Sequence, residues 1–423
     1  MSCRLIACVL PCLLCSVPCL GEVPVFPHRM PDEPPEVALS SAMQRMFGYP
    51  APRVQDNELF SQFRYTRLRG FENNGGDGTI SRRDPSRPIL VDGKYHVWYT
   101  KRHTVVPPLG AKRAHEATDQ VPSTDWDLCE IWHATSEDGF TWQEQGVAVP
   151  RPPKPIPGWR SVATPDVLIW KGKYYLYYQA FVEPSGTKGD WCAVSASYAD
   201  SPVGPWTHTH KTIIHTGKKG HWDQDAIHDP HPVVYKGKIY TYYKAAYNKW
   251  PDVRDKYAVG LGLAVAEDPL GPFVKHRLNP VLNSGHETTF FPFKNGIAAL
   301  AIKDGNERST MQFAEDGVNF EIASVLSLTP TAAAPFTPDA FTDTEDGRGI
   351  TWGLCHFINA GTRGRQHSIM ARFDCDLSLD VHDPTMKSTK VWHHPDVYFK
   401  QGLSAAQRQR INEANRKLLA EGL

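Results

Sequence analysis

The sequence predicts an all-β protein, a five-bladed β-propeller with short N-terminal and C-terminal helical extensions. One observation is a phrase that recurs along the chain, in which a Gly-Lys turn precedes a run of aromatic and β-branched residues. A second is a turn rich in glycine and proline that ends in an aromatic residue and follows each of the first four copies. The third is that no helical period is visible between Ile89 and Leu377.

The repeated phrases divide the chain into strand-turn-strand units. The first phrase is found, in three clear and two weaker copies, at residues 92–99, 171–178, 236–243, 295–300 and 346–352. The second phrase is found at residues 136–142, 201–206, 268–273 and 315–320. Glycines and prolines stand where the chain must reverse, and strand-forming residues fill the runs between them. Each unit is too small to bury a core alone, so five in a row favour a propeller. A β-sandwich is the alternative, but it would not need one phrase at near-regular intervals.

The first residues are typical of a secretory signal peptide. Arg4 precedes an apolar run from Leu5 to Leu20, and Gly21 supplies a small residue at the boundary. The run is shorter than the roughly 20 residues of a membrane-spanning helix, and it contains two prolines. We therefore expect removal of residues 1–21 and an exported protein, periplasmic or secreted. A buried N-terminal helix is the alternative.

The two ends differ from the repeats. Residues 38–48 are predicted to form a short helix that Gly48 and Pro50 stop. Ser404 could cap a C-terminal helix with apolar residues at helical spacing. The predicted organisation is a signal peptide (1–21), an N-terminal helical extension (22–59), a catalytic propeller (60–385) and a C-terminal extension (386–423). Both extensions are expected to serve packing or contacts between copies of the chain.

Composition narrows the classes of function. The 46 Lys and Arg residues balance the 46 Asp and Glu residues, so the formal charge is zero. The basic surplus that nucleic acids and anionic membranes attract is therefore missing. Aromatic residues make up 11% of the chain. That share suits a stacking surface for sugars or other flat ligands, although a β-rich core would explain much of it.

Cysteine usage leaves two alternatives. Five of the nine cysteines lie in the leader, and the others are Cys129, Cys192, Cys355 and Cys375. They contain no CxxC pair, which argues against a zinc site built from sulfur ligands. Export permits disulfides, for which four cysteines allow three connectivities. Buried free thiols are the alternative.

One acid precedes each turn glycine of the repeated phrase. These acids are Asp84, Asp166, Asp229, Glu287 and Asp339, which stand 9, 6, 8, 9 and 8 residues before Gly93, Gly172, Gly237, Gly296 and Gly347. The first strand of each propeller blade lines the central channel, so we expect the five acids to converge at one mouth of it. Crowded carboxylates repel and raise some of their pKa values, which is costly unless they serve as acid and base. Asp before Pro is also a common turn opener, which is the structural alternative.

Paired carboxylates across a channel suit the cleavage of glycosidic bonds. This reaction needs a proton donor to the leaving oxygen and a carboxylate near the anomeric carbon, and an inverting enzyme also leaves room for a water. Three tryptophans, Trp126, Trp159 and Trp222, could stack on a sugar or belong to the core.

Several motifs occur together in an order that is specific as a combination. They are residues 81–85, 125–128, 161–167, 177–179, 228–230 and 285–287, within Phe60 to Lys303. With them the sequence resembles family 117 of the glycoside hydrolases, the α-1,3-linked 3,6-anhydro-L-galactosidases that act on neoagaro-oligosaccharides. Residues 40–45 look like the family's helical Ser-x-Ala-x-x-Arg element, which there mediates a swapped dimer.

The resemblance implies a five-bladed propeller and an exo-acting inverting hydrolase that removes 3,6-anhydro-α-L-galactose from the non-reducing end. Asp84 matches the general base, and Asp229 matches the carboxylate that holds the transition state or tunes the acid. His286 matches the general acid, with Glu287 beside it. Residues that match the sugar subsite or lie in the matching stretches are Arg83, Trp126, Thr164, Asp166, Gln179 and His228. An imidazolium among carboxylates has its charged form favoured, which is compatible with a histidine acid, although Glu287 could be the acid instead.

Three other readings compete. A family-43-like propeller glycosidase acting on arabinan or xylan oligosaccharides would use three acids of the ring, here Asp84, Asp166 and Glu287. A non-catalytic carbohydrate-binding propeller would use the acids to hold a cation. A metal hydrolase would be built on His221, His228, Asp229 and His231, a spacing that fits no helix or strand ligand pattern.

Cofactors and partners follow from the same reasoning. Glycoside hydrolysis requires no cofactor, and a structural divalent cation could lie near the carboxylates. The expected partners are an oligosaccharide and a second copy of the chain, bound through the N-terminal helical segment. Nucleic acids and membranes are not expected as partners.

Overall fold

The computed structural model describes most of the chain between residues 24 and 388. The described ranges are 24–48, 58–186, 190–245, 260–305, 307–362 and 364–388, with a few isolated positions after 408. The predicted signal peptide and most of the predicted C-terminal helix lie outside the described residues. Among the described helices, none is long and apolar enough to cross a membrane.

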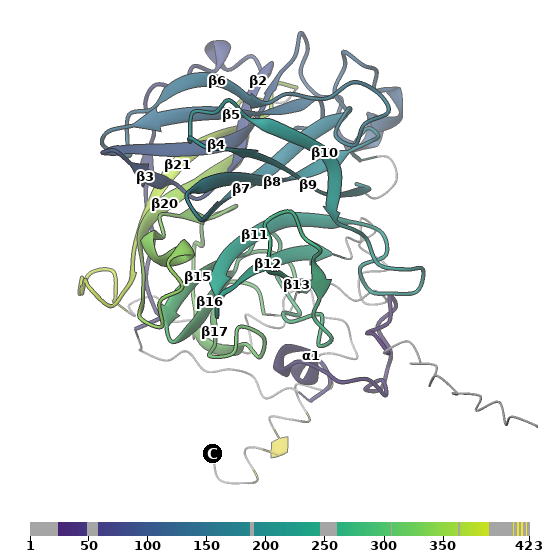
Figure 1. Cartoon of the computed structure of the whole chain (residues 1–423), viewed down its shortest axis with the longest axis vertical. Helices are drawn as coiled ribbons and strands as arrows, with labels where there is room; N and C mark the ends of the chain where they lie inside the picture. The colour runs from purple at the N-terminus through teal and green to yellow at the C-terminus, as the bar shows by residue number, and fades with distance from the viewer. Residues whose placement is uncertain are drawn as a thin grey trace, which may run out of the picture.

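The described chain is nearly all β-structure, in small antiparallel sheets (Figure 1). The first sheet contains β2 (Ile80–Pro85), β3 (Ile89–Val91), β4 (Lys94–His103), β5 (Cys129–Ser136) and β6 (Gln143–Val149). The second contains β7 (Ser161–Trp170), β8 (Lys173–Phe181), β9 (Cys192–Ala199) and β10 (Thr207–Ile214). The third contains β11 (Ile227–Tyr235), β12 (Lys238–Ala245), β13 (Gly260–Ala266) and β14 (Val274–Lys275).

The remaining strands form one eight-stranded sheet that consists of two groups. The first group is β15 (Thr289–Lys294), β16 (Gly296–Ala301), β17 (Thr310–Ala314) and β18 (Glu321–Val325). The second is β1 (Arg64–Arg67), β19 (Ala334–Pro335), β20 (Gly347–Ala360) and β21 (His367–Ser378). The groups meet where β15 pairs with β20, at Phe293 with Arg348 and at Lys294 with Gly347. Strand β1 pairs with β21, so the first and last strands of the repeated region are neighbours.

The predicted Gly-Lys turns are confirmed as tight hairpin turns. The two central residues have φ of 48° and 77° at Asp92–Gly93, 50° and 77° at Lys171–Gly172, and 51° and 70° at Lys236–Gly237. Positive φ at both central positions is the conformation of a type I′ turn, whose twist matches that of the flanking strands. The turn sequences therefore predict where these strands reverse.

Aromatic side chains fill the space between neighbouring sheets. Trp98 of β4 packs in one cluster with Val167 and Leu176 of the second sheet. Tyr242 of β12 stacks on Phe290 of β15, with ring centroids 3.9 Å apart. This packing brings the first strands of successive sheets together, so that β2 contacts β7, β7 contacts β11 and β11 contacts β15. The ends of these strands therefore meet in the interior.

The N-terminal helix is shorter than the sequence predicts. Helix α1 spans Ser41–Arg45, whereas residues 38–48 were expected to be helical. Ser40 has an extended backbone (φ −67°, ψ 162°), and its hydroxyl accepts the N–H of Met43, which makes it the cap. Short 3-10 turns occur at η1 (Asn74–Gly76), η2 (Ala111–Glu116) and η4 (Pro338–Phe341).

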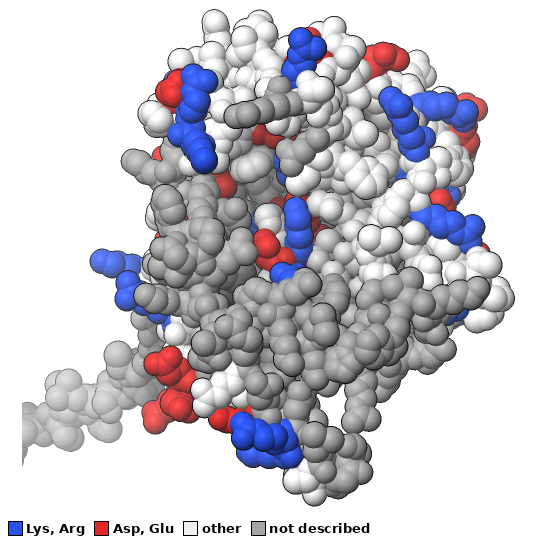
Figure 2. All heavy atoms as spheres, turned by 180° about the vertical axis from the view of Figure 1, so that it is seen from behind, with Lys and Arg blue, Asp and Glu red and all other residues white. Residues whose placement is uncertain are grey.

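Two open alternatives are settled by the structure. Cys129, Cys192, Cys355 and Cys375 are all buried free thiols, so the free-thiol reading is confirmed. Trp222 is only 3% exposed and stacks on Tyr243, which makes it a core residue and not a platform for a sugar. On the face shown in Figure 2, described Lys and Arg side chains lie beside Asp and Glu, in keeping with the balanced charge.

Candidate active site

A cavity of about 810 Å³ opens where the first strands of the sheets meet. Its polar lining includes Arg83, Asp84, Asp125, Trp126, Thr164, Gln179, Asp190, His228, Asp229, Lys244, His286, Glu287, Lys303 and His367. These residues belong to several sheets and to the loop before β15. A cavity of this size and polarity suits a small oligosaccharide.

Four lining residues share an uncommon backbone conformation. Asp84, Thr164, Asp229 and Glu287 have φ of 46°, 49°, 48° and 61°. At the first three, a register shift interrupts the pairing between the first and second strands of the sheet. Such a bulge redirects a side chain, and positive φ in a non-glycine residue costs about 1–3 kcal/mol and is concentrated at functional sites. The fold therefore sustains the same local strain in four places around one cavity.

Opposite these bulges, a second set of side chains comes from the second strands. Gln179 of β8 pairs with Ala163, Lys244 of β12 pairs with His228, and Lys303 bridges to His286. Each stands seven residues after a turn glycine, because 172 + 7 = 179, 237 + 7 = 244 and 296 + 7 = 303. His356 of β20 follows Gly349 by the same interval, since 349 + 7 = 356. Sequence reasoning missed Lys244, Lys303 and His356, and this constant spacing is the signal that could have found them.

Asp84 is held as a carboxylate. Its side chain is 4% exposed, with Arg83 Nε 2.7 Å from Oδ2 and His356 Nδ1 3.2 Å from Oδ1. The hydroxyl of Thr164 donates to Oδ2 at 3.3 Å. Burial opposes ionisation, but the charge of Arg83 and the contact with His356 outweigh it and hold the pKa of Asp84 well below its usual value. Asp84 is therefore able to accept a proton at neutral pH.

Asp229 is the second buried carboxylate. Gln179 Nε2 donates to Oδ1 at 2.6 Å, and Lys244 Nζ lies 3.0 Å from Oδ2. Burial raises its pKa, but Lys244 and, less strongly, His286 lower it, and the net result is a pKa of about 2. The influence of His286 also shows that Asp229 and the predicted acid face the same space.

His286 has a carboxylate partner that the sequence did not reveal. Its Nδ1 lies 2.9 Å from Asp304 Oδ2, and its backbone N–H donates to the carbonyl of Lys303 at 2.6 Å. The side chain is 25% exposed. A carboxylate at Nδ1 fixes the ring orientation and leaves Nε2 as the nitrogen for proton transfer. Asp304 lies 18 residues after His286, and no sequence spacing links it to the repeated acids.

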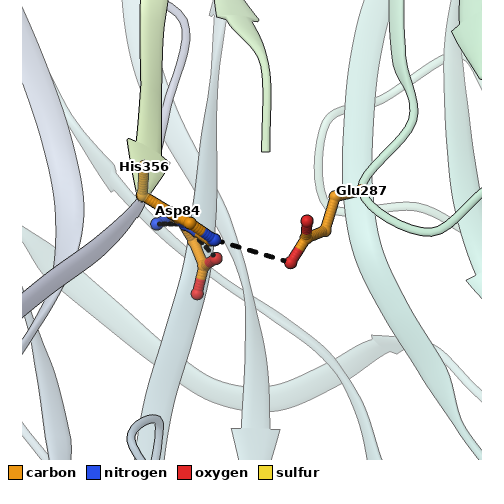
Figure 3. A group of neighbouring side chains, drawn as sticks. All are labelled: Asp84, Glu287 and His356. Atoms are coloured by element: carbon orange, nitrogen blue, oxygen red, sulfur yellow. Dashed lines mark hydrogen bonds and ion pairs between the residues drawn. The ribbon is translucent and has the colours of Figure 1, made fainter. Parts of the chain in front are cut away.

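Glu287 completes a compact cluster with Asp84 and His356, in which Glu287 points toward the other two residues (Figure 3). Its Oε1 lies 3.7 Å from His356 Nε2 and 3.7 Å from Arg83 Nη2. One ligand atom from each member of the cluster lies within 4.8 Å of the others. Within the described part of the chain, the buried atoms Glu287 Oε2 and His356 Nε2 have no hydrogen-bond partner.

The structure separates the predicted site residues into two sets. Residues that line the cavity are Arg83, Asp84, Trp126, Thr164, Gln179, His228, Asp229, His286 and Glu287. Asp166 does not line it, because it lies two residues past the bulge at Thr164 and pairs with Arg87 at 2.9 Å. Asp339 lies on η4, where it accepts the backbone N–H of Arg348 at 2.7 Å.

The expected convergence of five acids is therefore replaced by a different arrangement. Three acids, Asp84, Asp229 and Glu287, meet at the cavity, while Thr164 occupies the corresponding position of the second sheet. The signal was present in the sequence, since Asp166 stands 6 residues before its turn glycine and the other acids stand 8 or 9. Thr164, 8 residues before Gly172, is the residue in register.

The metal-hydrolase reading finds no support in the geometry. His231 pairs with Asp166 at 3.3 Å, and His228 Nε2 contacts the carbonyl of Asp190 at 2.7 Å. Among the described residues, the group that could hold a metal ion is Asp84, Glu287 and His356, and it includes none of the four residues that this reading requires. Trp159 lies outside the cavity as well, whereas Trp126 lines it with the guanidinium of Arg83 at 5.0 Å from its ring.

Ionised carboxylates and an oriented histidine in a cavity of saccharide size are the machinery of a glycoside hydrolase. The chain is 72% identical to a family 117 glycoside hydrolase of the marine bacterium Zobellia galactanivorans, over 82% of this chain and 100% of that one, with a TM-score of 0.75. The chain therefore belongs to family 117 of the glycoside hydrolases, and its substrate is an oligosaccharide.

More distant structures share the fold alone. A glycoside hydrolase superposes with a TM-score of 0.50 at 12% identity, over 80% of this chain and 96% of that one. A complex of BT0996 and RGII also gives 0.50 at 12% identity, over 81% of this chain and 99% of that protein. No family model matches the sequence. No curated protein matches it either.

Proposed function

We propose that this enzyme is an exo-acting, inverting glycosidase that removes 3,6-anhydro-α-L-galactose from the non-reducing end of neoagaro-oligosaccharides by cleaving an α-1,3 linkage. The observation that carries the proposal is the presence of Asp84 and the His286–Asp304 pair on the lining of one cavity. Asp84 is ionised and His286 is oriented by a carboxylate, which are the states that a base and an acid require.

The proposed reaction is a single displacement. Asp84 takes a proton from a water molecule while the water oxygen bonds to the anomeric carbon. The bond from that carbon to the glycosidic oxygen breaks, its electron pair stays on the leaving oxygen, and this oxygen takes the proton from His286. Attack on the face opposite the leaving group inverts the anomeric configuration. Exchange of protons with solvent then restores both side chains.

The other charged residues support charge development at the sugar. Asp229, kept ionised by Lys244, places a negative charge near the ring as it becomes oxocarbenium-like. We assign the acid to His286 because Asp304 orients it, and we assign Glu287 a supporting role because it lies between Arg83 and His356. We propose that Arg83, Trp126, Thr164, Gln179 and His228 contact the sugar. A family-43-like set of acids is disfavoured because Asp166 lies outside the cavity.

We infer five blades for the fold. The first three sheets supply one blade each, and the eight-stranded sheet supplies two, because its groups are joined by only two residue pairs between β15 and β20. The pairing of β1 with β21 would join the last blade to the start of the repeats.

A divalent cation fits the cluster of Asp84, Glu287 and His356. The residues offer two carboxylates and an imidazole, and the buried atoms Glu287 Oε2 and His356 Nε2 have no partner among the described residues. Carboxylate oxygens and water are the ligands that hard cations prefer. When bound, the cation would hold the carboxylates in place and offset their repulsion, and the proposed proton transfers do not depend on it.

We propose that the protein is exported and forms a homodimer through the N-terminal segment. The composition of residues 1–21 supports export. The Ser-x-Ala-x-x-Arg pattern at residues 40–45 supports the dimer, since this element is the one that the family resemblance associates with swapping. Size-exclusion chromatography with light scattering on the mature chain tests the dimer.

Incubation with neoagarobiose and a panel of arabino- and xylo-oligosaccharides tests the proposed function. We expect release of the anhydro sugar from neoagarobiose, with NMR showing the inverted anomer first, and loss of this activity in Asp84→Asn. Hydrolysis of the arabinan or xylan substrates alone would overturn the proposed substrate while leaving the enzyme class in place. Retention of the anomeric configuration would overturn the roles given to Asp84 and His286.

A further inference from the structure

Helix α1 is bound to segments that lie far from it in the sequence. The hydroxyl of Ser40 donates to the carbonyl of Pro280 at 2.6 Å, and the amide of Asn283 donates to the carbonyl of Ala42 at 2.7 Å. Ser40 is 0% exposed and Asn283 is 3% exposed, so water does not compete for these hydrogen bonds. The helix lies beneath the sheets that carry β13 and β17 (Figure 1).

The last residue of the helix makes the strongest contact. Arg45 binds Glu307 in a bidentate arrangement, with Nε 2.6 Å from Oε1 and Nη2 3.1 Å from Oε2. The Glu307 side chain is 0% exposed, and its Oε2 also accepts from the amide of Gln312. A buried carboxylate that loses its cation is strongly destabilised. Arg45 therefore fixes the position of Glu307.

These contacts continue without interruption to the proposed acid. The backbone N–H of Glu307 donates to the hydroxyl of Ser284 at 2.8 Å, and this hydroxyl donates to Asn283 Oδ1 at 2.7 Å. Next along the chain, the backbone N–H of Gly285 donates to the carbonyl of Asp304 at 3.0 Å. His286 and Asp304 thus lie on two short segments, 280–287 and 303–307, and α1 is bound to both.

We propose that α1 positions the proton donor: Arg45 and Ser40, through Glu307 and the 280–287 segment, hold His286 and Asp304 in register with each other. The inference rests on the proposed role of His286 as the acid. Residues 280–287 carry little regular structure of their own, and Gly285 and Glu287 both have positive φ, at 111° and 61°. A segment in this conformation keeps one geometry only when its surroundings impose it.

Two measurements on Arg45→Met test the proposal. The first is hydrogen exchange of the backbone amides by mass spectrometry, which needs no substrate. We expect faster exchange in residues 280–287 and 303–307, with little change in the strands of the first sheet. The second is cleavage of neoagarobiose against a 2,4-dinitrophenyl 3,6-anhydro-α-L-galactoside, whose leaving group needs no acid. We expect kcat for neoagarobiose to fall by about tenfold or more and kcat for the aryl glycoside to change little, since a general acid contributes roughly 10²–10⁴-fold.

Matched variants separate positioning from stability. Lys275→Met is the control, because Lys275 Nζ lies 2.5 Å from Oδ2 of the buried Asp223, a pair that touches neither segment. It should lower the melting temperature without either local effect. Arg45→Lys keeps the charge but not the bidentate geometry, and we expect partial recovery. If Arg45→Met does not fold, Ser40→Ala makes the same test with a smaller disturbance.

The outcomes are distinguishable. Unchanged exchange in 280–287 and 303–307, or equal losses on both substrates, would overturn the positioning role. If the wild-type enzyme cleaves neither glycoside, the proposed function fails, and the exchange measurement still decides whether α1 orders the two segments.

Discussion

Replacing Asp304 by Asn isolates the partner of the proposed acid. Asn has nearly the same shape as Asp, and it tolerates the positive φ of 57° that Asp304 adopts, so the backbone should keep its course. The change removes the charge that lies 2.9 Å from His286 Nδ1. A hydrogen bond to a charged group contributes about 1.5–3 kcal/mol. The two side chains are 25% and 34% exposed, so solvent screening places the effect at the lower end, about 1.5 kcal/mol.

That energy corresponds to a loss of about tenfold in kcat/KM on neoagarobiose, since each 1.36 kcal/mol is a factor of about ten in rate. We also expect the alkaline limb of the kcat/KM profile to move to lower pH, because the imidazolium loses a neighbouring negative charge. Asp346→Asn is the control, as it removes an exposed carboxylate that pairs with Arg348 at 3.3 Å. A loss confined to KM, with the pH profile unmoved, would refute the assignment of Asp304 as the partner of the acid.

Two further predictions concern stability. Burial and the neighbouring His96 lower the pKa of His133 to about 3, so folding stability from this group is complete above its unfolded value of 6.5 and is lost as the pH falls toward 3. We expect the urea midpoint to drop between pH 7 and pH 5, and to drop less in His133→Phe; equal drops would argue against His133 as the source. A Cβ at Gly285 would lie 2.0 Å from Thr288 Oγ1, whereas none of the surrounding atoms lies within 4 Å of one at Gly93. Gly285→Ala should therefore lower both the melting temperature and kcat, while Gly93→Ala should cost only the roughly 1–2 kcal/mol of backbone strain.

The hairpin positions could be predicted from the sequence because the turn chemistry is local. A pair such as Lys171–Gly172 must adopt positive φ at both positions, and the aromatic strands on either side then pair in one register. The repeat of this unit predicted a β-rich fold of similar sheets. Asp84, Asp229 and Glu287 followed from it, since each stands at a constant interval before the turn.

The partners of these acids could not be predicted in the same way. The His286–Asp304 pair depends on two loop segments that meet only in the folded chain, and the Arg45–Glu307 pair joins residues 262 positions apart. Asp166 was misplaced because a bulge at Thr164 reverses which side chain faces the cavity, and a bulge leaves little trace in a single sequence. Local patterns thus predict strands and turns, while the electrostatic partners are set by packing between sheets.

The regular spacing of the second strands gives the site a common design. The residue seven positions after the turn glycine is Gln179 in the second sheet, Lys244 in the third and Lys303 in the strand group that begins with β15. Gln179 and Lys244 both bind Asp229, so one carboxylate is held by two sheets at once. His356, at the same interval after Gly349, lies between Asp84 and Glu287. Because each acid is held by a residue from another strand, a shift of any one sheet would change the ionisation of a carboxylate in its neighbour, and the chemistry of the cavity therefore depends on the packing of the sheets around it.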